Sequence, residues 1–128
     1  MRKEAEAWLT IAGEELQSAE YLLDKRLFRM VCYHAQQCVE KTLKALLIDR
    51  EIETPRTHNI LDLNAAVKKL GHEPRLADED AIFLTSLYRS RYPSSLGLLP
   101  SGEPTAQDAQ ASVRIAKDLI EWLKNKLK

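Results

Sequence analysis

The sequence has little of what builds β-sheets, secreted folds or membrane spans. Its 128 residues include only 4 glycines, 5 prolines and 2 cysteines, and aromatic residues make up 6%. So few aromatic residues argue against a multi-stranded sheet and favour helices. The first residues, 1–6, lack the apolar run of a signal peptide, and no stretch approaches the ~20 apolar residues of a membrane span. We therefore expect a cytoplasmic protein that does not enter a membrane.

An excess of one charge is also absent. Lys and Arg together number 19, and Asp and Glu together number 19, so no net field draws the whole chain to nucleic acid or membrane. The content of 45% apolar and 30% charged residues is ordinary for a globular protein. We expect one domain over residues 1–128, with any nucleic-acid contact confined to a local patch.

The motifs that identify most enzymes are missing. The sequence has no P-loop, no G-x-G-x-x-G, no H-E-x-x-H, no C-x-x-C and no G-x-S-x-G. Its three histidines and two cysteines lack the spacing of a zinc site. Cys32 and Cys38 lie about 9 Å apart on one predicted helix, too far for a disulfide. We expect reduced core thiols, no metal and no cofactor.

Helical periodicity is the strongest structural signal. Apolar residues recur at three- and four-residue spacing in five segments, which cover residues 2–24, 29–50, 58–70, 78–92 and 105–127. Gly13 lies inside the first segment, where it costs about 1 kcal/mol relative to Ala and indicates a close approach of another helix. The pattern predicts an all-α fold, an up-and-down bundle of four to five helices.

Several segment ends carry recognisable signals. Asn59 or Thr57 can cap the third helix, and Gly71 is placed to end it. Thr105 precedes the fifth helix with Asp108 three residues later, a variant of the capping box.

Two neighbouring arginines are the first candidate for a binding site. Between residues 81 and 102 there is no Asp or Glu, and Arg89 and Arg91 are the only charged residues. They stand in the sequence Tyr-Arg-Ser-Arg-Tyr-Pro with Tyr92 beside them. Guanidinium groups can hold a phosphate bidentately, and a tyrosine can stack on a base. Alternatively, each arginine pairs with a carboxylate of another helix and the tyrosines are partly buried.

A polar stripe on the second predicted helix is the second candidate. Four residues at i, i+3, i+7 and i+10 project together: His34, Gln37, Lys41 and Lys44. The stripe could form a second basic wall opposite the arginines, a solvated face or a packing seam. Arg29 and His34 have the R-x-x-x-x-H spacing of some ribonucleases, but ~140° of helical rotation separates their side chains.

Several segments together resemble the HEPN domain family. Residues 33–47, Tyr-His-Ala-Gln-Gln-Cys-Val-Glu-Lys-Thr-Leu-Lys-Ala-Leu-Leu, are similar to the signature helix of that family. Residues 58–63 resemble its H-[DN]-L helix start, residues 88–93 its R-Y-P segment, and residues 105–109 the opening of its last helix. The resemblance extends over nearly the whole chain.

The resemblance implies a homodimeric nucleotide-binding bundle, paired with a minimal nucleotidyltransferase in a toxin–antitoxin-like system. Many HEPN domains are metal-independent ribonucleases with a late R-x(4–6)-H motif, but residues 94–98 contain no histidine. General acid–base cleavage would lack its imidazole there. We therefore expect a binding module for a nucleotide or RNA phosphate rather than an enzyme, whose candidate binding residues are Arg89, Arg91, Tyr92, His34, Gln37 and Lys41.

Two alternatives remain open at this point. One is a ribonuclease toxin, in which His34 or Tyr92 comes near Arg91 across helices or across a dimer. The other is a scaffold for protein interactions that binds no small ligand.

Overall fold

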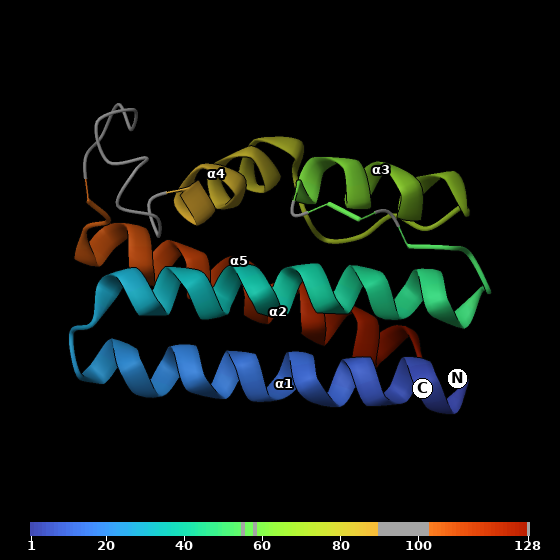
Figure 1. Ribbon diagram of the computed structural model, residues 1–128, viewed down its shortest axis with the longest axis horizontal. Helices are drawn as coiled ribbons and strands as arrows, with labels where there is room; N and C mark the ends of the chain where they lie inside the picture. The colour runs from blue at the N-terminus through green and yellow to red at the C-terminus, as the bar shows by residue number, and fades with distance from the viewer. Residues whose placement is uncertain (55, 58, 90–102, 128) are drawn as a thin grey trace.

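The fold is all-α in the part of the chain that the structure describes. The computed structural model describes residues 1–54, 56–57, 59–89 and 103–127, and for Tyr88 and Arg89 only the helical backbone. That part contains α1 (Lys3–Asp24), α2 (Phe28–Asp49), α3 (Ile60–Lys69), α4 (Asp78–Arg89) and α5 (Ala106–Lys126) (Figure 1). None of these helices is long and apolar enough to cross a bilayer. The predicted helical bundle is confirmed.

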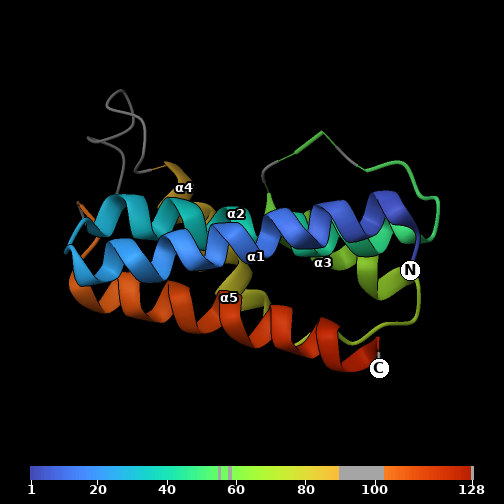
Figure 2. The same ribbon diagram turned by 90° about the horizontal axis from the view of Figure 1, so that it is seen from below.

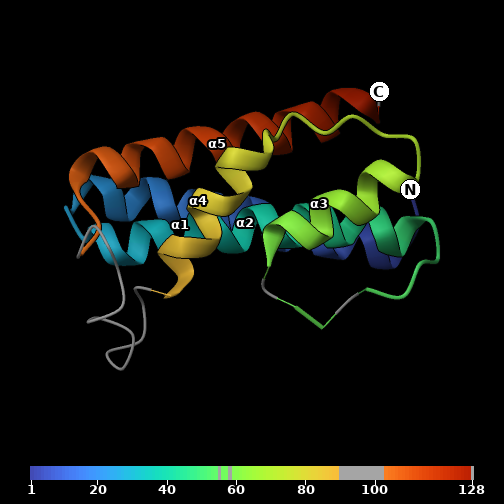
Figure 3. The ribbon, with the colours of Figure 1, turned by 90° about the horizontal axis from the view of Figure 1, so that it is seen from above.

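The second helix lies at the centre of the bundle. α2 packs against α1, α3, α4 and α5. α1 lies on one side of α2, and α3 and α4 follow each other along the opposite side (Figure 1, Figure 2 and Figure 3). The apolar stripes of all five helices meet in one core, whose largest fully buried aliphatic side chains include Leu43, Leu47, Ile60, Leu63, Leu84, Leu119, Ile120 and Leu123.

Two helix starts are capped as the sequence predicts. The Thr105 hydroxyl accepts a hydrogen bond from the Asp108 amide at 3.1 Å, and the Asp108 carboxylate accepts one from the Thr105 amide at 3.0 Å. This reciprocal pair is a capping box. At the start of α3 the Asn59 side chain accepts from the Leu61 amide at 3.0 Å. Of the two predicted caps it is Asn59 that occupies the position, while the Thr57 hydroxyl accepts from the Asn59 amide.

Three helices end at a left-handed residue. Gly71 has φ 91° after α3, in agreement with its predicted role as the residue that ends this helix. Arg26 has φ 59° after α1, and Glu51 has φ 58° after α2. A residue other than glycine adopts this conformation at a cost of roughly 1–2 kcal/mol. The left-handed residue after α1 ends the helix and allows the chain to turn directly into α2.

Gly13 makes no close helix–helix contact within the chain. A Cβ atom built at this position would meet no atom within 4 Å apart from its chain neighbours and the backbone of its own helix. The close approach that the sequence predicted is thus wrong for the isolated chain. Gly13 instead lines an open groove between α1 and α5.

The two cysteines are buried thiols, as the sequence predicts. Cys32 and Cys38 are both free and lie in the core. Burial raises the pKa of Cys32 to about 11 and that of Cys38 to about 12, because a thiolate is poorly solvated there. At neutral pH both stay protonated and act as small apolar side chains.

Removing the capping box should weaken the last helix measurably. We expect Thr105→Ala to lower the free energy of unfolding by about 1 kcal/mol, since the Asp108 amide loses its acceptor. Urea denaturation followed by circular dichroism measures this. Gln107→Ala, at an exposed position in the same turn, is the matched control and should change stability by less than about 0.5 kcal/mol. Equal effects of the two substitutions would contradict a stabilising role for the cap.

Candidate functional site

The polar stripe of α2 is largely occupied by contacts with α1. One carboxylate, Glu15 of α1, contacts two side chains of the stripe: His34 Nδ1 lies 2.7 Å from Oε1, and Lys41 Nζ lies 2.5 Å from Oε2. The side chains are only partly exposed, at 22% for His34, 21% for Lys41 and 14% for Glu15. The cluster links α1 to α2, and removal of one partner would leave the others unpaired in a partly buried place.

The rest of the stripe is also paired within the chain. Lys44 Nζ lies 3.5 Å from the Glu40 carboxylate, and its ammonium stands 6.0 Å from the ring centroid of Trp8 on α1. Gln37 is only 7% exposed, and its side-chain amide donates to Gln36 at 2.9 Å. Carboxylates thus neutralise both lysines, and the contacts are those of a packing seam.

The stripe and the end of α4 lie on different sides of α2. The Glu15 contacts hold His34 and Lys41 on the side of α1, whereas α4 covers the opposite side (Figure 1 and Figure 3). Within one chain, the body of α2 therefore separates these side chains from α4.

The three other predicted site residues adjoin the end of α4. Arg89 is the last residue of α4, and its side chain is not described. Arg91 and Tyr92 lie outside the described residues. Chain connectivity alone places Arg91 two residues beyond the α4 terminus.

Three further cations gather at the same end of the bundle. The connection from α1 to α2, the start of α5 and the end of α4 all lie there (Figure 1 and Figure 3). That connection carries Lys25 and Arg26, and Arg29 follows in the first turn of α2. We call Lys25, Arg26 and Arg29 the turn cations. They were not among the predicted site residues, although their Lys-Arg-x-x-Arg spacing in a short connection is visible in the sequence.

The turn cations stand beside aromatic and apolar side chains. The Lys25 ammonium lies 5.5 Å from the Tyr21 ring centroid, and the Arg26 guanidinium lies 5.1 Å from that of Phe28. Arg29 pairs with Glu103, which precedes α5. Lys25 and Arg26 form no ion pair with any described residue.

No metal centre forms in the described part of the chain. There, no three His, Cys, Asp or Glu residues come together as a metal site requires. His72, after α3, contacts the ring of Trp122 edge-on, and partial burial with nearby Lys126 and Arg50 lowers its pKa. A neutral imidazole packed on tryptophan acts as part of the fold.

The sequence matches a known family along nearly all of its length. The model of the HEPN domain family matches residues 5–126. The chain belongs to the HEPN family. The resemblance that residues 33–47 first indicated is thereby confirmed.

This HEPN protein is also similar to a named relative and to two solved structures. It is 28% identical to the Methanocaldococcus jannaschii protein named "Putative toxin MJ1304", in an alignment covering 98% of this chain and 90% of the relative. The crystal structure of ST0689, an archaeal HEPN homologue, superposes with a TM-score of 0.74 at 29% identity, covering 100% of both chains. That of TT1696 from Thermus thermophilus gives a TM-score of 0.83 at 26% identity, covering 98% of this chain and 99% of the other.

The Glu15 cluster should contribute to the stability of this HEPN fold. We expect Glu15→Gln to lower the free energy of unfolding by roughly 1–3 kcal/mol, because two partly buried side chains, His34 and Lys41, lose the carboxylate that they share. Urea denaturation measures the change. Glu20→Gln, an exposed carboxylate on the same helix, is the control for charge removal. A loss no larger than that of Glu20→Gln would show that the cluster is not structural.

Proposed function

We propose that this HEPN protein holds a phosphate group of a nucleotide or RNA at the end of the bundle where α4 terminates. The observation that carries the proposal is the gathering of the turn cations at that end, beside the α4 terminus that bears Arg89. Arg91 follows two residues later in the sequence. Two chain segments that are far apart in the sequence, the α1–α2 connection and the end of α4, thus both bring cationic residues to this end of the molecule.

The chemistry of these residues suits an anionic ligand with a flat base. Guanidinium groups bind phosphate oxygens through two parallel hydrogen bonds, and lysine adds a point charge. Tyr21, beside Lys25, and Tyr92 from the adjoining segment provide rings on which a base can stack. His34, Gln37 and Lys41 have internal partners, so we assign them at most a peripheral part in binding.

Removing the cations should weaken phosphate binding strongly. We expect Arg89→Ala with Arg91→Ala, and separately Lys25→Ala with Arg26→Ala, each to weaken binding of ATP or a short RNA at least tenfold. The dependence of affinity on salt should also become shallower, since fewer counter-ions are released. Fluorescence anisotropy with labelled RNA and calorimetry with ATP measure both.

A matched pair of substitutions controls for general loss of charge. Lys69→Ala with Arg75→Ala removes two exposed cations, one at the last residue of α3 and one in the connection that follows it, away from the α4 terminus. This variant should keep its affinity. Unchanged affinity in both cation-depleted variants would exclude the proposed site, and no binding by the wild type would favour a scaffold without ligand.

We also propose a cytoplasmic, toxin-like role for the protein as a homodimer paired with a minimal nucleotidyltransferase. Three observations support this role: similarity to a protein named as a toxin, membership of the HEPN family, and two free cysteines that suit a reducing compartment. A second candidate activity is metal-independent RNA cleavage. His34 favours it, because Glu15 fixes its ring as a carboxylate does for a general base.

Growth of an expressing host distinguishes these activities. If RNA cleavage is the activity, we expect overexpression to arrest growth, and both His34→Ala and Arg91→Ala to relieve the arrest. If binding alone is the activity, His34→Ala should behave as the wild type does. Co-expression of a nucleotidyltransferase encoded beside the gene should relieve any arrest and yield a complex that co-purifies. A wild type that neither arrests growth nor forms this complex would contradict the toxin-like role.

A further inference from the structure

A cleft between α1 and α2 lies next to the turn cations. Its volume is about 420 Å³. Five residues of α1 and one of α2 line it: Glu14, Gln17, Ser18, Tyr21, Leu22 and His34. The α1 residues belong to the second half of that helix, which leads directly into the turn that carries Lys25 and Arg26. The cleft and the proposed phosphate site are therefore neighbours along one helix.

The ring of Tyr21 connects the cleft with that turn. Tyr21 is 64% exposed, and the Lys25 ammonium lies 5.5 Å from its ring centroid. From Gln17 to Lys25 the helix rises ~12 Å, which is comparable to the length of an extended nucleoside triphosphate. A nucleotide whose phosphates meet the turn cations can thus stack its base on Tyr21.

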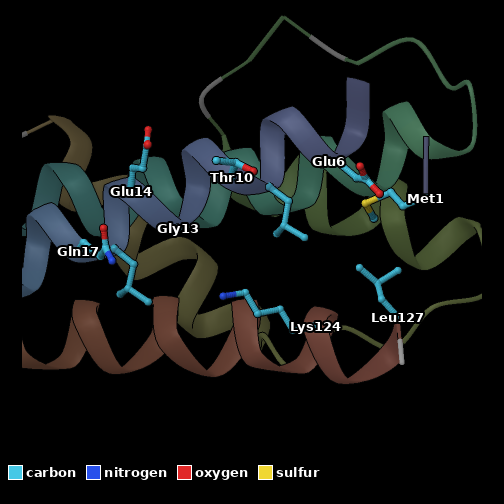
Figure 4. Close-up of a pocket in the computed structure, with 10 residues that line it drawn as sticks. Met1, Glu6, Thr10, Gly13, Glu14, Gln17, Lys124 and Leu127 are labelled. Carbon is cyan, nitrogen blue, oxygen red and sulfur yellow. The ribbon is translucent and has the colours of Figure 1, made fainter. Parts of the chain in front are cut away.

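The end of the cleft farther from Lys25 carries a carboxylate without an internal partner. Glu14 forms no ion pair with a residue in the described ranges. Figure 4 shows that its side chain points away from α5. Gln17, one turn further along α1, makes no side-chain hydrogen bond with a described residue either. A free carboxylate disfavours a phosphate at this end but accepts hydrogen bonds from the N–H groups of a ligand.

The α2 wall of the cleft is an imidazole held in one orientation. His34 Nδ1 lies 2.7 Å from the Glu15 carboxylate, and the ring of Tyr33 packs edge-on against the imidazole with a centroid separation of 5.1 Å. Contacts on two sides thus fix the ring. A wall that is already ordered costs little additional entropy when a flat ligand enters beside it.

We infer that the cleft binds a guanine base whose phosphate lies on the turn cations, with Glu14 accepting hydrogen bonds from the guanine N1–H and 2-amino groups. This inference rests on the proposed phosphate site, because the turn cations hold the phosphate of the same ligand. It adds to that site a preference for one base. Gln17, on the same face of α1, can donate its amide hydrogen to guanine O6.

The free carboxylate selects guanine over the other bases of RNA. Guanine presents two adjacent donors on its pairing edge, and the two oxygens of one carboxylate can accept from both. Adenine and cytosine present a single amino group beside a ring nitrogen whose lone pair a carboxylate repels. Uracil presents one N–H between two carbonyl oxygens. Glu14 therefore suits guanine, while stacking on Tyr21 makes no distinction among the bases.

Calorimetry with GTP, ATP and inosine triphosphate tests the guanine subsite. Inosine triphosphate differs from GTP only in lacking the 2-amino group. The wild type should bind GTP about tenfold more tightly than ATP, and inosine triphosphate with an affinity between the two. Glu14→Ala should bring the three affinities within about threefold of one another, because the acceptor for the guanine edge is gone.

The ratio of the affinities is the decisive readout, because Glu14→Ala also removes a charge that repels phosphate. Glu20→Ala removes an exposed carboxylate of α1 that does not line the cleft, and this matched control should keep the preference for GTP. Tyr21→Ala should weaken binding of all three nucleotides by a similar factor, and Tyr21→Phe should restore it, since only the ring is needed for stacking.

Short labelled RNAs that carry either one guanosine or one inosine distinguish a free nucleotide from RNA as the source of the base. A preference for guanosine seen only in these RNAs, measured by fluorescence anisotropy, assigns the subsite to RNA. Equal binding of GTP and ATP together with equal binding of the two RNAs overturns the guanine subsite and leaves the phosphate site standing. So does a preference for guanine that survives Glu14→Ala. A wild type that binds neither the nucleotides nor the RNAs overturns the phosphate site and this inference with it.

Discussion

The burial of α2 among the four other helices is the constraint on which the rest of the structure depends. A helix covered on several sides must bury polar groups together with its apolar stripe, and each buried polar group needs a partner. Glu15 supplies that partner for His34 and Lys41, and Glu40 supplies it for Lys44. The basic residues of the α2 stripe, which the sequence suggested as a binding surface, therefore make contacts within the bundle.

The end of the bundle where α4 terminates differs from this seam. Cations at helix termini are not required for packing, and Lys25 and Arg26 have no ionic partner among the described residues. The left-handed conformation of Arg26 closes the turn that carries them to the α4 terminus. Phosphate recognition there would use side chains that the fold holds in place without pairing them with a carboxylate among the described residues.

The outer faces of α1 and α5 are not fully covered by the rest of the described chain. Their inner stripes complete the core, while Gly13 and Lys124 face a groove that no described side chain of the protein fills.

Periodicity within the sequence determined the helices, their caps at Asn59 and Thr105, the buried cysteines and the family, because these depend on residues a few positions apart. Tertiary structure alone decided the pairing of Glu15 with His34 and Lys41, which lie 19 and 26 positions away. It also decided that Lys25 and Arg26 share an end with α4, and that Gly13 faces open space. These relations depend on how whole helices pack together. The spacing of residues along one helix does not specify which other helices lie against it.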